Sequence, residues 1–406
     1  MKKDLERLMR EKGINGIVGI GSPHNDANMF YLLNGVRING WYIKKYRGPA
    51  YVLHSEIERE EAQKTGLKTV SFNKYNLHEI YNKYRDRIKA NAHFLATVLK
   101  DFNINGRIAF YGNAQLGYGY NFLRQLKRLY SGLEICYEPE KSIVMEARMT
   151  KDPEEVARIR KVRNSVVQAF ARTIEWVRQM KVKDGVIYKD RNRKLIIRDL
   201  KKNIEHELFK EGAVSTSGMI VAQARDAGVP HNSGKDGEVV RLGTTIVFDI
   251  FPQEIGGGYY FDFTRTVCFG YAPDYVKRDF ELVKEAQEIA FENLKVGRRT
   301  REIEQAVCEF FEKHNHSTFL SNPKTQVGYC HSLGHGLGLN VHESPSFGLL
   351  KTNQDRLEKG MVFTIEPGLY YPDKGYGIRL EDVIYIDKNG RPVNLTNYPR
   401  TLVIEI

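Results

Sequence analysis

The chain has 406 residues, of which 41% are hydrophobic and 28% charged, a composition that indicates a folded protein and excludes intrinsic disorder. At about 100–200 residues per domain, this length predicts two or three domains. No segment approaches the roughly 18 consecutive apolar residues of a membrane-spanning helix, and residues 1–13 lack the apolar core of a secretory signal, so we expect a cytoplasmic protein without a membrane partner.

The net charge of +12 is concentrated near the N-terminus, where residues 1–150 contain 24 Lys and Arg against 15 Asp and Glu. The basic residues there, among them Arg85, Arg87 and Lys89, are scattered and lack the interleaved aromatic side chains of single-strand nucleic-acid binders. We interpret this surplus as a solvated basic face and expect no nucleic-acid partner, with a phosphate-binding surface as the alternative. The four cysteines form no CxxC pair, which is typical of a reducing compartment.

Short apolar runs alternate with amphipathic segments over residues 1–147, which predicts a first domain of the α/β class with a largely buried sheet. The charged run 1–13 is helix-like. We predict strands at residues 17–20, 41–43, 49–54 and 107–111, and helices at residues 55–64 and 78–99.

A helix start marks the beginning of the second domain, which we place at residues 148–406. Asp152 is a candidate N-cap, Pro153 occupies the first helical position and two glutamates follow in the first turn. Apolar residues then recur every three or four positions up to Val177, which predicts a long helix with one buried face. Further helices are predicted at residues 275–294 and 301–314, the latter capped by Thr300, and strands at residues 244–250, 361–366 and 382–386.

Two aspartates interrupt the apolar strand sequence of the second domain. Asp249 follows Val247 and Phe248, and Asp262 precedes the run Phe263-Thr-Arg-Thr. An ionised carboxylate in such surroundings is strongly disfavoured unless it is paired or bound to a cation. The three glycines at residues 256–258 predict a hairpin that brings the two aspartates together across the ladder.

Three histidines lie close together in the sequence, at His331, His335 and His342. Glycines separate them, and we expect these small residues to let the imidazoles point into a cavity. The spacing is unlike that of a zinc finger. A single buried histidine is more often a core residue than a ligand, whereas a cluster of three favours metal binding or acid–base chemistry.

Two glutamates border apolar runs near the C-terminus. Glu366 ends the run 362–365 and Glu381 begins another, although Glu381 beside Arg379 is equally consistent with an ordinary ion pair. Together with the two aspartates these acids carry four negative charges, which two divalent cations would neutralise, with neutral His335 as the nitrogen donor. Oxygen donors and one imidazole suit Mn²⁺, Co²⁺, Fe²⁺ or Zn²⁺. Two such ions can hold and activate a water molecule, so hydrolysis is the expected chemistry.

The motifs around these residues resemble, in their order along the chain, those of the pita-bread metallopeptidases, the family of methionine aminopeptidase, aminopeptidase P and prolidase. The shared motifs are an Asp in a strand, an Asp before Phe-Thr-Arg-Thr, a Gly-His-Gly run, an Ile-Glu-Pro-Gly run and Arg-Leu-Glu-Asp. The resemblance implies an α/β (α+β) architecture in which a pita-bread catalytic domain, residues 148–406, follows an N-terminal domain. It also implies a dinuclear site in which Asp262 and Glu381 bridge the ions and whose five ligands are Asp249, Asp262, His335, Glu366 and Glu381.

Further matches are similar to the proline-specific branch of this family. His231 in Val-Pro-His-Asn resembles a substrate-contacting histidine, His342 resembles the histidine that stabilises the tetrahedral species, and His331 matches a position seen in the proline-directed branch. The segments 29–35 and 51–56 resemble the creatinase-type N-terminal domain of proline-specific members. The resemblance therefore implies an Xaa-Pro aminopeptidase or dipeptidase that takes peptides with proline at the second position, forms a homodimer and uses two divalent ions, with Mn²⁺ expected first.

The implied mechanism is attack of a metal-bridging hydroxide on the Xaa-Pro carbonyl while Glu366 accepts the proton of the water. His342 and His231 would hold the substrate and the developing oxyanion. His331 is expected to take part in substrate binding. Two alternatives stay open: a metal-free creatinase-type hydrolase and a catalytically silent binding protein of the same fold.

Arg379 is expected to contact substrate and to orient Glu381 and Asp382, with a purely structural ion pair as the alternative. The sequence also departs from the family pattern in two places. The two predicted aspartate ligands are further apart along the chain than in the usual family hairpin, and the segment 190–206 is unusually basic and long.

Overall fold

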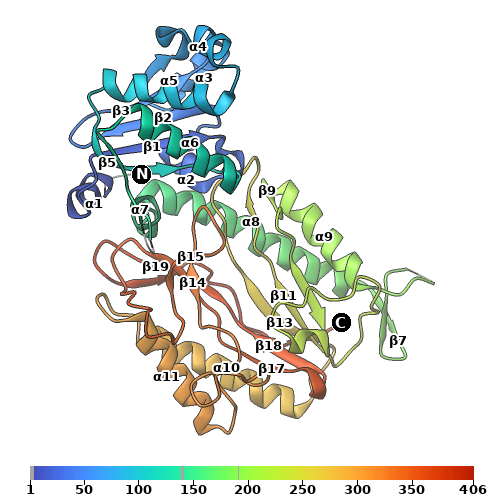
Figure 1. Cartoon of the computed structure of the whole chain (residues 1–406). Coiled ribbons are helices and arrows are strands. Elements are labelled where there is room, and N and C mark those ends of the chain that lie inside the picture. Colours follow the sequence, from blue (N-terminus) through green and yellow to red (C-terminus); the bar gives the residue numbers. More distant parts are fainter. Residues whose placement is uncertain (1–3, 139–140, 191) are drawn as a thin grey trace. The chain divides into compact units, whose positions relative to one another are not determined.

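The computed structural model describes residues 4–138, 141–190 and 192–406, and it divides into two compact units, Met1–Arg148 and Met149–Ile406 (Figure 1). Residues 1–3 of the helix-like run 1–13 and residue 191 of the basic segment 190–206 lie outside the described residues. Within the described ranges, no helix is both long enough and apolar enough to cross a bilayer.

The first unit contains a mixed six-stranded sheet. β1, β2 and β3 pair antiparallel at its centre, while the pairs β3–β4, β1–β5 and β5–β6 are parallel. All four strands predicted in this unit are present. In spatial order the strands are β4 (Lys68–Ser71), β3 (Ala50–His54), β2 (Gly40–Lys45), β1 (Gly16–Gly21), β5 (Gly106–Tyr111) and β6 (Leu133–Ile135).

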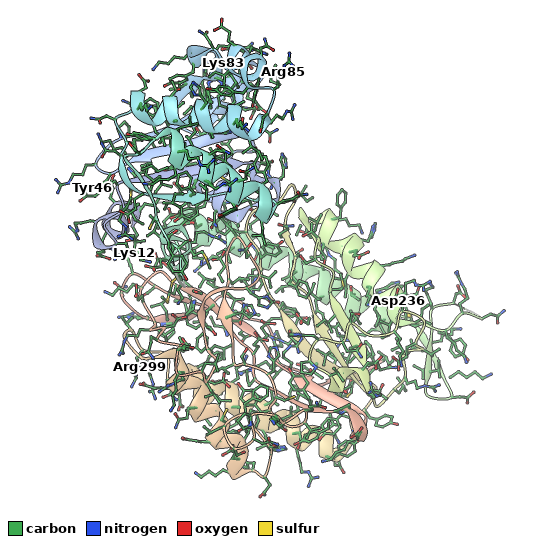
Figure 2. The ribbon with its side chains drawn as sticks, viewed as in Figure 1. Lys12, Tyr46, Lys83, Arg85, Asp236 and Arg299 are labelled. Atoms are coloured by element: carbon green, nitrogen blue, oxygen red, sulfur yellow. The ribbon has the colours of Figure 1, made fainter. Side chains whose placement is uncertain are left out.

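One predicted helix of this unit is broken in two. The single helix predicted over residues 78–99 is two helices, because Arg85 adopts a left-handed φ of 45° and Asp86 caps the second helix by accepting hydrogen bonds from the amides of Ile88 and Lys89. Lys83 and Arg85 at this turn are exposed (Figure 2). The helices are α1 (Leu5–Glu11), α2 (Ala27–Leu32), α3 (Arg59–Lys64), α4 (Leu77–Tyr84), α5 (Arg87–Asp101), α6 (Leu116–Leu129) and α7 (Ile143–Met149).

A buried apolar cluster joins α5 to the sheet of the first unit. Phe94 and Leu95 of α5 pack against Val18 and Ile108 of the central strands, and the Phe94 ring meets Trp41 edge-on at 5.0 Å. Burial of apolar area of this kind is the main source of stability for such a layer. The predicted helix over residues 55–64 is shorter, since residues 56–58 form a 3₁₀ turn ahead of α3.

The second unit is built on two antiparallel sheets, in which one short edge pair is parallel. The first has the order β10 (Ile220–Gln223), β11 (Thr245–Asp249), β13 (Thr264–Phe269) and β21 (Val403–Ile404). The second has the order β15 (Glu343–Ser346), β14 (His335–Gly336), β16 (Val362–Ile365), β19 (Asp382–Ile386) and β20 (Pro392–Asn394). The amide of Glu381 donates to the carbonyl of Thr264 at 3.2 Å, so the two sheets meet at this bridge.

Three two-stranded ribbons complete the second unit. They pair β17 (Gly368–Tyr371) with β18 (Tyr376–Arg379), β7 (Lys181–Lys183) with β8 (Val186–Tyr188), and β9 (Ala213–Val214) with β12 (Gln253–Glu254). The predicted hairpin between the two aspartates is therefore wider than expected. Asp249 pairs across the ladder with Thr264, and the connection that contains Asp262 detours through β12.

Four helices cover the strands of the second unit. α8 (Pro153–Arg178) and α9 (Ile197–Lys210) lie on one side, and α10 (Asp274–Glu292) and α11 (Thr300–Lys313) on the other (Figure 1). The predicted cap of α8 is confirmed, because Asp152 forms a capping box with Glu155. The predicted cap of α11 is wrong: Thr300 is the first residue of the helix, and its hydroxyl donates to the Ser346 carbonyl at 2.6 Å.

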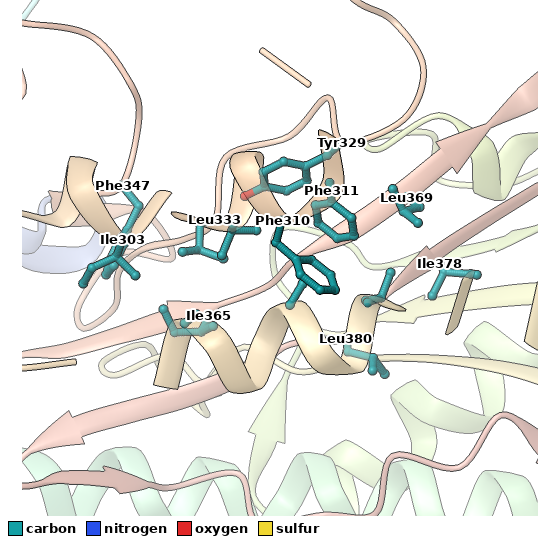
Figure 3. Close-up of a cluster of buried hydrophobic side chains, with 14 of the residues drawn as sticks. Ile303, Phe310, Phe311, Tyr329, Leu333, Phe347, Ile365, Leu369, Ile378 and Leu380 are labelled. Atoms are coloured by element: carbon teal, nitrogen blue, oxygen red, sulfur yellow. The ribbon is translucent and has the colours of Figure 1, made fainter. Parts of the chain in front are cut away.

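A buried apolar cluster in this unit joins α11 to the sheets. Ile303, Phe310 and Phe311 of the helix pack with Ile365 and Leu333 in one buried cluster (Figure 3). Leu333 lies two residues from His335 and Ile365 lies next to Glu366. The core therefore holds the backbone on which two of the predicted ligands are mounted.

The break between α4 and α5 allows a test of local stability. Replacing Asp86 with alanine removes the acceptor for two amides at the start of α5, so we expect the free energy of unfolding to fall by about 1 kcal/mol. Asp86→Asn keeps an oxygen acceptor and serves as the matched control. Chemical denaturation of both variants provides the measurement, and equal stability of Asp86→Ala and wild type would show that the cap does not stabilise α5.

Candidate functional site

The five predicted ligands converge on one pocket of about 460 Å³ in the second unit. They come from four separate parts of the chain, which the two sheets bring together at the seam where Thr264 bridges to Glu381. His231, His331, His342 and Arg379 line the same pocket. The structure thus places every sequence-predicted site residue around one cavity. The five converging residues are Asp249, Asp262, His335, Glu366 and Glu381.

Three of these side chains are spaced to share one ion. Donor atoms of Asp262, His335 and Glu381 all lie within 4.8 Å of one another. The Nε2 atom of His335 lies 3.2 Å from Oε1 of Glu366 and 3.8 Å from Oδ2 of Asp262. Carboxylate oxygens and an imidazole nitrogen at these separations suit a divalent cation of the Mn²⁺ or Zn²⁺ type.

The ring of His335 is oriented by its own backbone neighbour. Its Nδ1 lies 3.1 Å from the carbonyl oxygen of Gly336, and because a carbonyl can only accept, Nδ1 carries a proton and donates it. Nε2 is therefore the atom that faces the acids. A backbone acceptor of this kind is a common partner of a metal-binding histidine.

The glycines on either side of His335 allow close approach of neighbouring backbone segments. A Cβ at Gly334 would overlap the carbonyl of Thr364, and one at Gly336 would overlap the carbonyl of Ser344. These glycines therefore allow β14 to lie tightly between its neighbouring segments. This backbone packing is a constraint that sequence reasoning did not predict.

Two threonines that sequence reasoning missed hold the carboxylates. The hydroxyl of Thr264 donates to Oε2 of Glu381 at 2.6 Å, while Oε1 of Glu381 is buried without a hydrogen-bond partner. The hydroxyl of Thr364 donates to Oε1 of Glu366 and accepts from the amide of His335, both at 3.1 Å. A buried carboxylate oxygen without a hydrogen-bond donor fits a cation ligand.

Arg379 contacts a different acid from the one predicted. Its guanidinium pairs with Asp249 and donates to the Tyr370 hydroxyl at 3.0 Å and the Pro230 carbonyl at 3.2 Å. The structure pairs Arg379 with neither Glu381, its partner in the alternative of an ordinary ion pair, nor Asp382. The reason is that β18 directs Arg379 toward the end of β11, whose last residue is Asp249.

Asp382, which Arg379 was expected to orient, is held by another arginine. Arg265 pairs with Asp382 at 2.8 Å, and both side chains are almost fully buried. Arg265 also donates to the carbonyl of Glu381 at 2.7 Å. It therefore fixes the strand start that carries the ligand Glu381, although the sequence offered it only as part of the Phe-Thr-Arg-Thr run.

The four acids are crowded beyond what a single arginine can neutralise. Burial, reinforced by the charge of Asp249, raises the pKa of Asp262 well above its ordinary value, and burial and the charge of Asp262 do the same for Glu381. Burial raises the pKa of Asp249 despite the opposing effect of Arg379. Carboxyl groups that resist ionisation in this way gain most from a bound divalent cation.

The remaining histidines form a second group along the pocket. Nδ1 of His331 lies 2.9 Å from the Ser332 carbonyl and donates to it, so Nε2 of His331 accepts from Nε2 of His231 at 3.1 Å. Burial lowers the pKa of His331 to about 4, so this ring is neutral. The exposed ring of His342 meets His335 edge-on at 4.3 Å.

Glu304 is a buried acid that sequence reasoning also missed. It lies on α11 and is 1% exposed, and its Oε2 accepts from the amide of Leu333 at 2.6 Å. Burial raises its pKa to about 8. The signal in the sequence was a glutamate on the apolar stripe of α11, between Thr300 and Val307, where solvent cannot reach it.

Comparison with known proteins places this geometry in a family context. Residues 157–388, more than half of the chain, match the model of metallopeptidase family M24. The chain is 27% identical to an Xaa-Pro dipeptidase of Pyrococcus furiosus over 407 residues, which cover 99% of this chain and 100% of that protein. It is 33% identical to an uncharacterized peptidase of Methanocaldococcus jannaschii over 253 residues, 61% of this chain and 63% of that protein.

Solved structures confirm the predicted fold class. An X-Pro aminopeptidase from Thermotoga maritima MSB8 superimposes with a TM-score of 0.75 at 24% identity, covering 98% of this chain and 100% of that chain. An Xaa-Pro dipeptidase from Bacillus anthracis superimposes with a TM-score of 0.76 at 22% identity, covering 100% of this chain and 98% of that chain. The match over almost the whole chain agrees with an N-terminal domain followed by a pita-bread domain.

The raised pKa of Glu304 predicts a pH-dependent stability. The folded state keeps the Glu304 proton up to about pH 8, whereas the unfolded chain releases it near the ordinary pKa of glutamate. The stabilisation of the folded state by protonated Glu304 is therefore complete below about pH 4 and is lost as the pH rises through 8. Relative to Glu304→Gln, which cannot titrate, wild type should lose up to about 1.4 kcal/mol of unfolding free energy per pH unit between pH 5 and 8.

Denaturant titrations of the metal-free proteins across this range supply the measurement. Glu309→Gln, an exposed glutamate of the same helix, is the control and should follow wild type. Parallel curves for wild type and Glu304→Gln would show that Glu304 ionises normally in the folded protein.

Proposed function

The chain belongs to metallopeptidase family M24, and on this basis we propose that it is a metal-dependent exopeptidase that hydrolyses Xaa-Pro peptide bonds. The observation that carries the proposal is the buried set of four carboxylates and one imidazole around a single pocket, opposed by one arginine. Neither a silent binding protein nor a metal-free hydrolase needs that concentration of buried acids. The names of the relatives support the Xaa-Pro specificity.

We propose that Asp249, Asp262, His335, Glu366 and Glu381 would hold two divalent cations, with Asp262 and Glu381 as the residues that would be shared between them. The unpartnered oxygen of Glu381 and the close spacing of Asp262, His335 and Glu381 support this ligand set. Such ions supply a water of lowered pKa and polarise the peptide carbonyl. Mn²⁺ is our first candidate because oxygen donors outnumber the single nitrogen donor.

Glu366 is proposed as the proton acceptor. Burial alone would raise its pKa, but the neighbouring imidazoles, including the hydrogen bond from His335, lower it to about 2, so the carboxylate is ionised. Its two oxygens are held apart by different partners, since Oε1 faces His335 and Oε2 lies 3.6 Å from Nδ1 of His331. A fixed, ionised carboxylate within reach of the pocket is what general-base catalysis requires.

The pocket histidines are proposed to bind the peptide. His342 is exposed into the pocket beside His335, so its ring can donate to the oxygen that becomes negative during hydrolysis. His231 and His331 share one hydrogen bond and line another part of the wall. Arg379 lines the pocket as well. Its hydrogen bond to Asp249 supports a role in orienting that ligand more than a role in contacting substrate.

The walls of the pocket are compatible with a proline ring. Apolar side chains lie beside the acids, which allows a compact apolar group to be desolvated next to a polar reaction centre. The substrate we propose is a peptide with proline at its second position. The apolar lining consists of Met219, Ile220, Phe251 and Val341.

The assembly and location of the protein remain proposals. We propose a homodimer, which is supported by the exposure of Leu116 and Tyr120 in the first unit at 91% and 70%. A cytoplasmic location is supported by the four free cysteines. We propose no nucleic-acid partner, since the surplus of basic residues in the first unit is explained as a solvated face.

Substitution of the ligands separates metal binding from turnover. Asp262→Ala removes a carboxylate from the centre of the ligand set, so we expect loss of bound metal and of measurable hydrolysis. His342→Ala leaves the ligand set intact and should retain metal while losing at least about 100-fold in kcat, the effect of removing one oxyanion donor. Elemental analysis and hydrolysis of Ala-Pro are the measurements.

Asp236→Ala is the control for these variants, because Asp236 pairs with Arg198 and Lys201 on the surface of the same unit (Figure 2). This variant should keep both metal and activity. Full activity of metal-free Asp262→Ala protein would contradict the proposed centre directly.

Substrate specificity provides an independent test. We expect hydrolysis of Ala-Pro or Ala-Pro-Ala with Mn²⁺, abolition by a chelator and recovery on adding Mn²⁺, with Co²⁺ and Zn²⁺ run in parallel. Ala-Ala and Ala-Ala-Ala are the matched controls and should be cleaved at least about tenfold more slowly, a difference that one well-fitted apolar ring can supply. Equal cleavage of all four peptides would rule out proline specificity.

A further inference from the structure

Glu304 lies outside the pocket, yet it is connected to two of its ligands through the backbone of one residue, Leu333. Its Oε2 accepts from the amide of Leu333 at 2.6 Å. The carbonyl of the same residue, Leu333, accepts from the amide of Glu366 at 2.7 Å. A buried acid on α11 is thereby coupled, through the backbone of Leu333, to a proposed metal ligand and proton acceptor on the far side.

The position of Leu333 also couples Glu304 to His335. Leu333 lies midway between His331 and His335, so the peptide that Glu304 holds belongs to the segment that carries both imidazoles. The ring of His335 is oriented from the backbone, through the Gly336 carbonyl. A shift of the Leu333 peptide would therefore move Nε2 of His335 relative to Asp262, which now lies 3.8 Å away.

The surroundings of Glu304 make its hydrogen bond to Leu333 difficult to replace. The side chain of Leu333 is buried in the same apolar cluster as Ile303 and Phe310 of α11 (Figure 3). The thiol of Cys308 lies 3.6 Å from Oε1 of Glu304 and is also buried. In an apolar environment a buried amide without an acceptor is strongly unfavourable, so the loss of this oxygen would displace the segment that now uses it.

We propose that Glu304 is a positioning residue that holds the Leu333 peptide, and through it His335 and Glu366, in the geometry that binds the metal ions. It does not touch the ions or the substrate. Supporting contacts outside the ligand set commonly change metal affinity by 10–100-fold when they are removed. This inference rests on the proposed metal centre, so its test includes the metal affinity of the wild-type protein.

The experiment compares variants that keep or remove the acceptor oxygen. Glu304→Leu removes it, whereas Glu304→Gln keeps an amide oxygen at the same distance from the backbone. Glu309→Leu is the matched control, an exposed position on the same helix. Titration calorimetry of each metal-free protein with Mn²⁺ gives the affinity, hydrolysis of Ala-Pro gives kcat and KM, and thermal unfolding without metal reports the fold.

We expect Glu304→Leu to bind Mn²⁺ about 10–100-fold more weakly, with kcat reduced more than KM is raised, and to unfold at a lower temperature without metal because the Leu333 amide loses its acceptor. Glu304→Gln should stay within about threefold of wild type, since the acceptor is retained. Glu309→Leu should be unchanged. If Glu304→Leu does not fold, Glu304→Met, which matches glutamate in length and lacks the oxygen, replaces it with the same expected loss.

Two results would overturn the inference while leaving the metal centre intact. One is unchanged Mn²⁺ affinity in the folded Glu304→Leu or Glu304→Met protein. The other is a loss in Glu304→Gln of more than tenfold, because that variant keeps the acceptor. Failure of wild-type protein to bind Mn²⁺ would overturn the metal centre itself, and the inference with it.

Discussion

The organisation of the second unit depends on a cluster of four buried carboxylates. Four carboxylates and four imidazoles line a pocket in which one guanidinium, that of Arg379, contacts a single acid, Asp249. Charges of like sign in a poorly solvated region repel one another strongly, and burial keeps the pKa values of Asp262 and Glu381 high. A chain keeps such an arrangement only where positive charge from outside, such as that of divalent cations, balances it.

The fold meets this constraint by placing each acid at or near a strand end and by holding Asp249, Glu366 and Glu381 with side chains of strand residues. Thr264 holds Glu381 from β13, and Thr364 joins Glu366 to the backbone of His335. Arg265 secures the segment that begins β19. The ligands are therefore fixed by short hydrogen bonds to rigid sheet, which agrees with the preorganisation that a metal-dependent hydrolase requires.

The sequence revealed the acids and histidines but not most of their supports. Asp249 and Glu366 stood out because charged residues are conspicuous in apolar runs, and the motif order then predicted the fold. Thr264 and Thr364 gave no such signal, since threonine is an ordinary strand residue. The partner of Arg379 could not be predicted, because it depends on the register between β18 and β11, which are far apart in the chain. The break before Asp86 was missed because apolar periodicity continues across it.

The tight fit of Gly334 and Gly336 has a consequence for how related sequences are to be interpreted. Both positions are restricted by backbone carbonyls of Thr364 and Ser344, so the packing of β14 is by itself enough to constrain them. A descendant that had lost catalysis but kept this sheet would still need both glycines. A Gly-His-Gly run therefore indicates common ancestry and a shared architecture. The acids around the pocket are the residues that distinguish an active enzyme from an inactive relative.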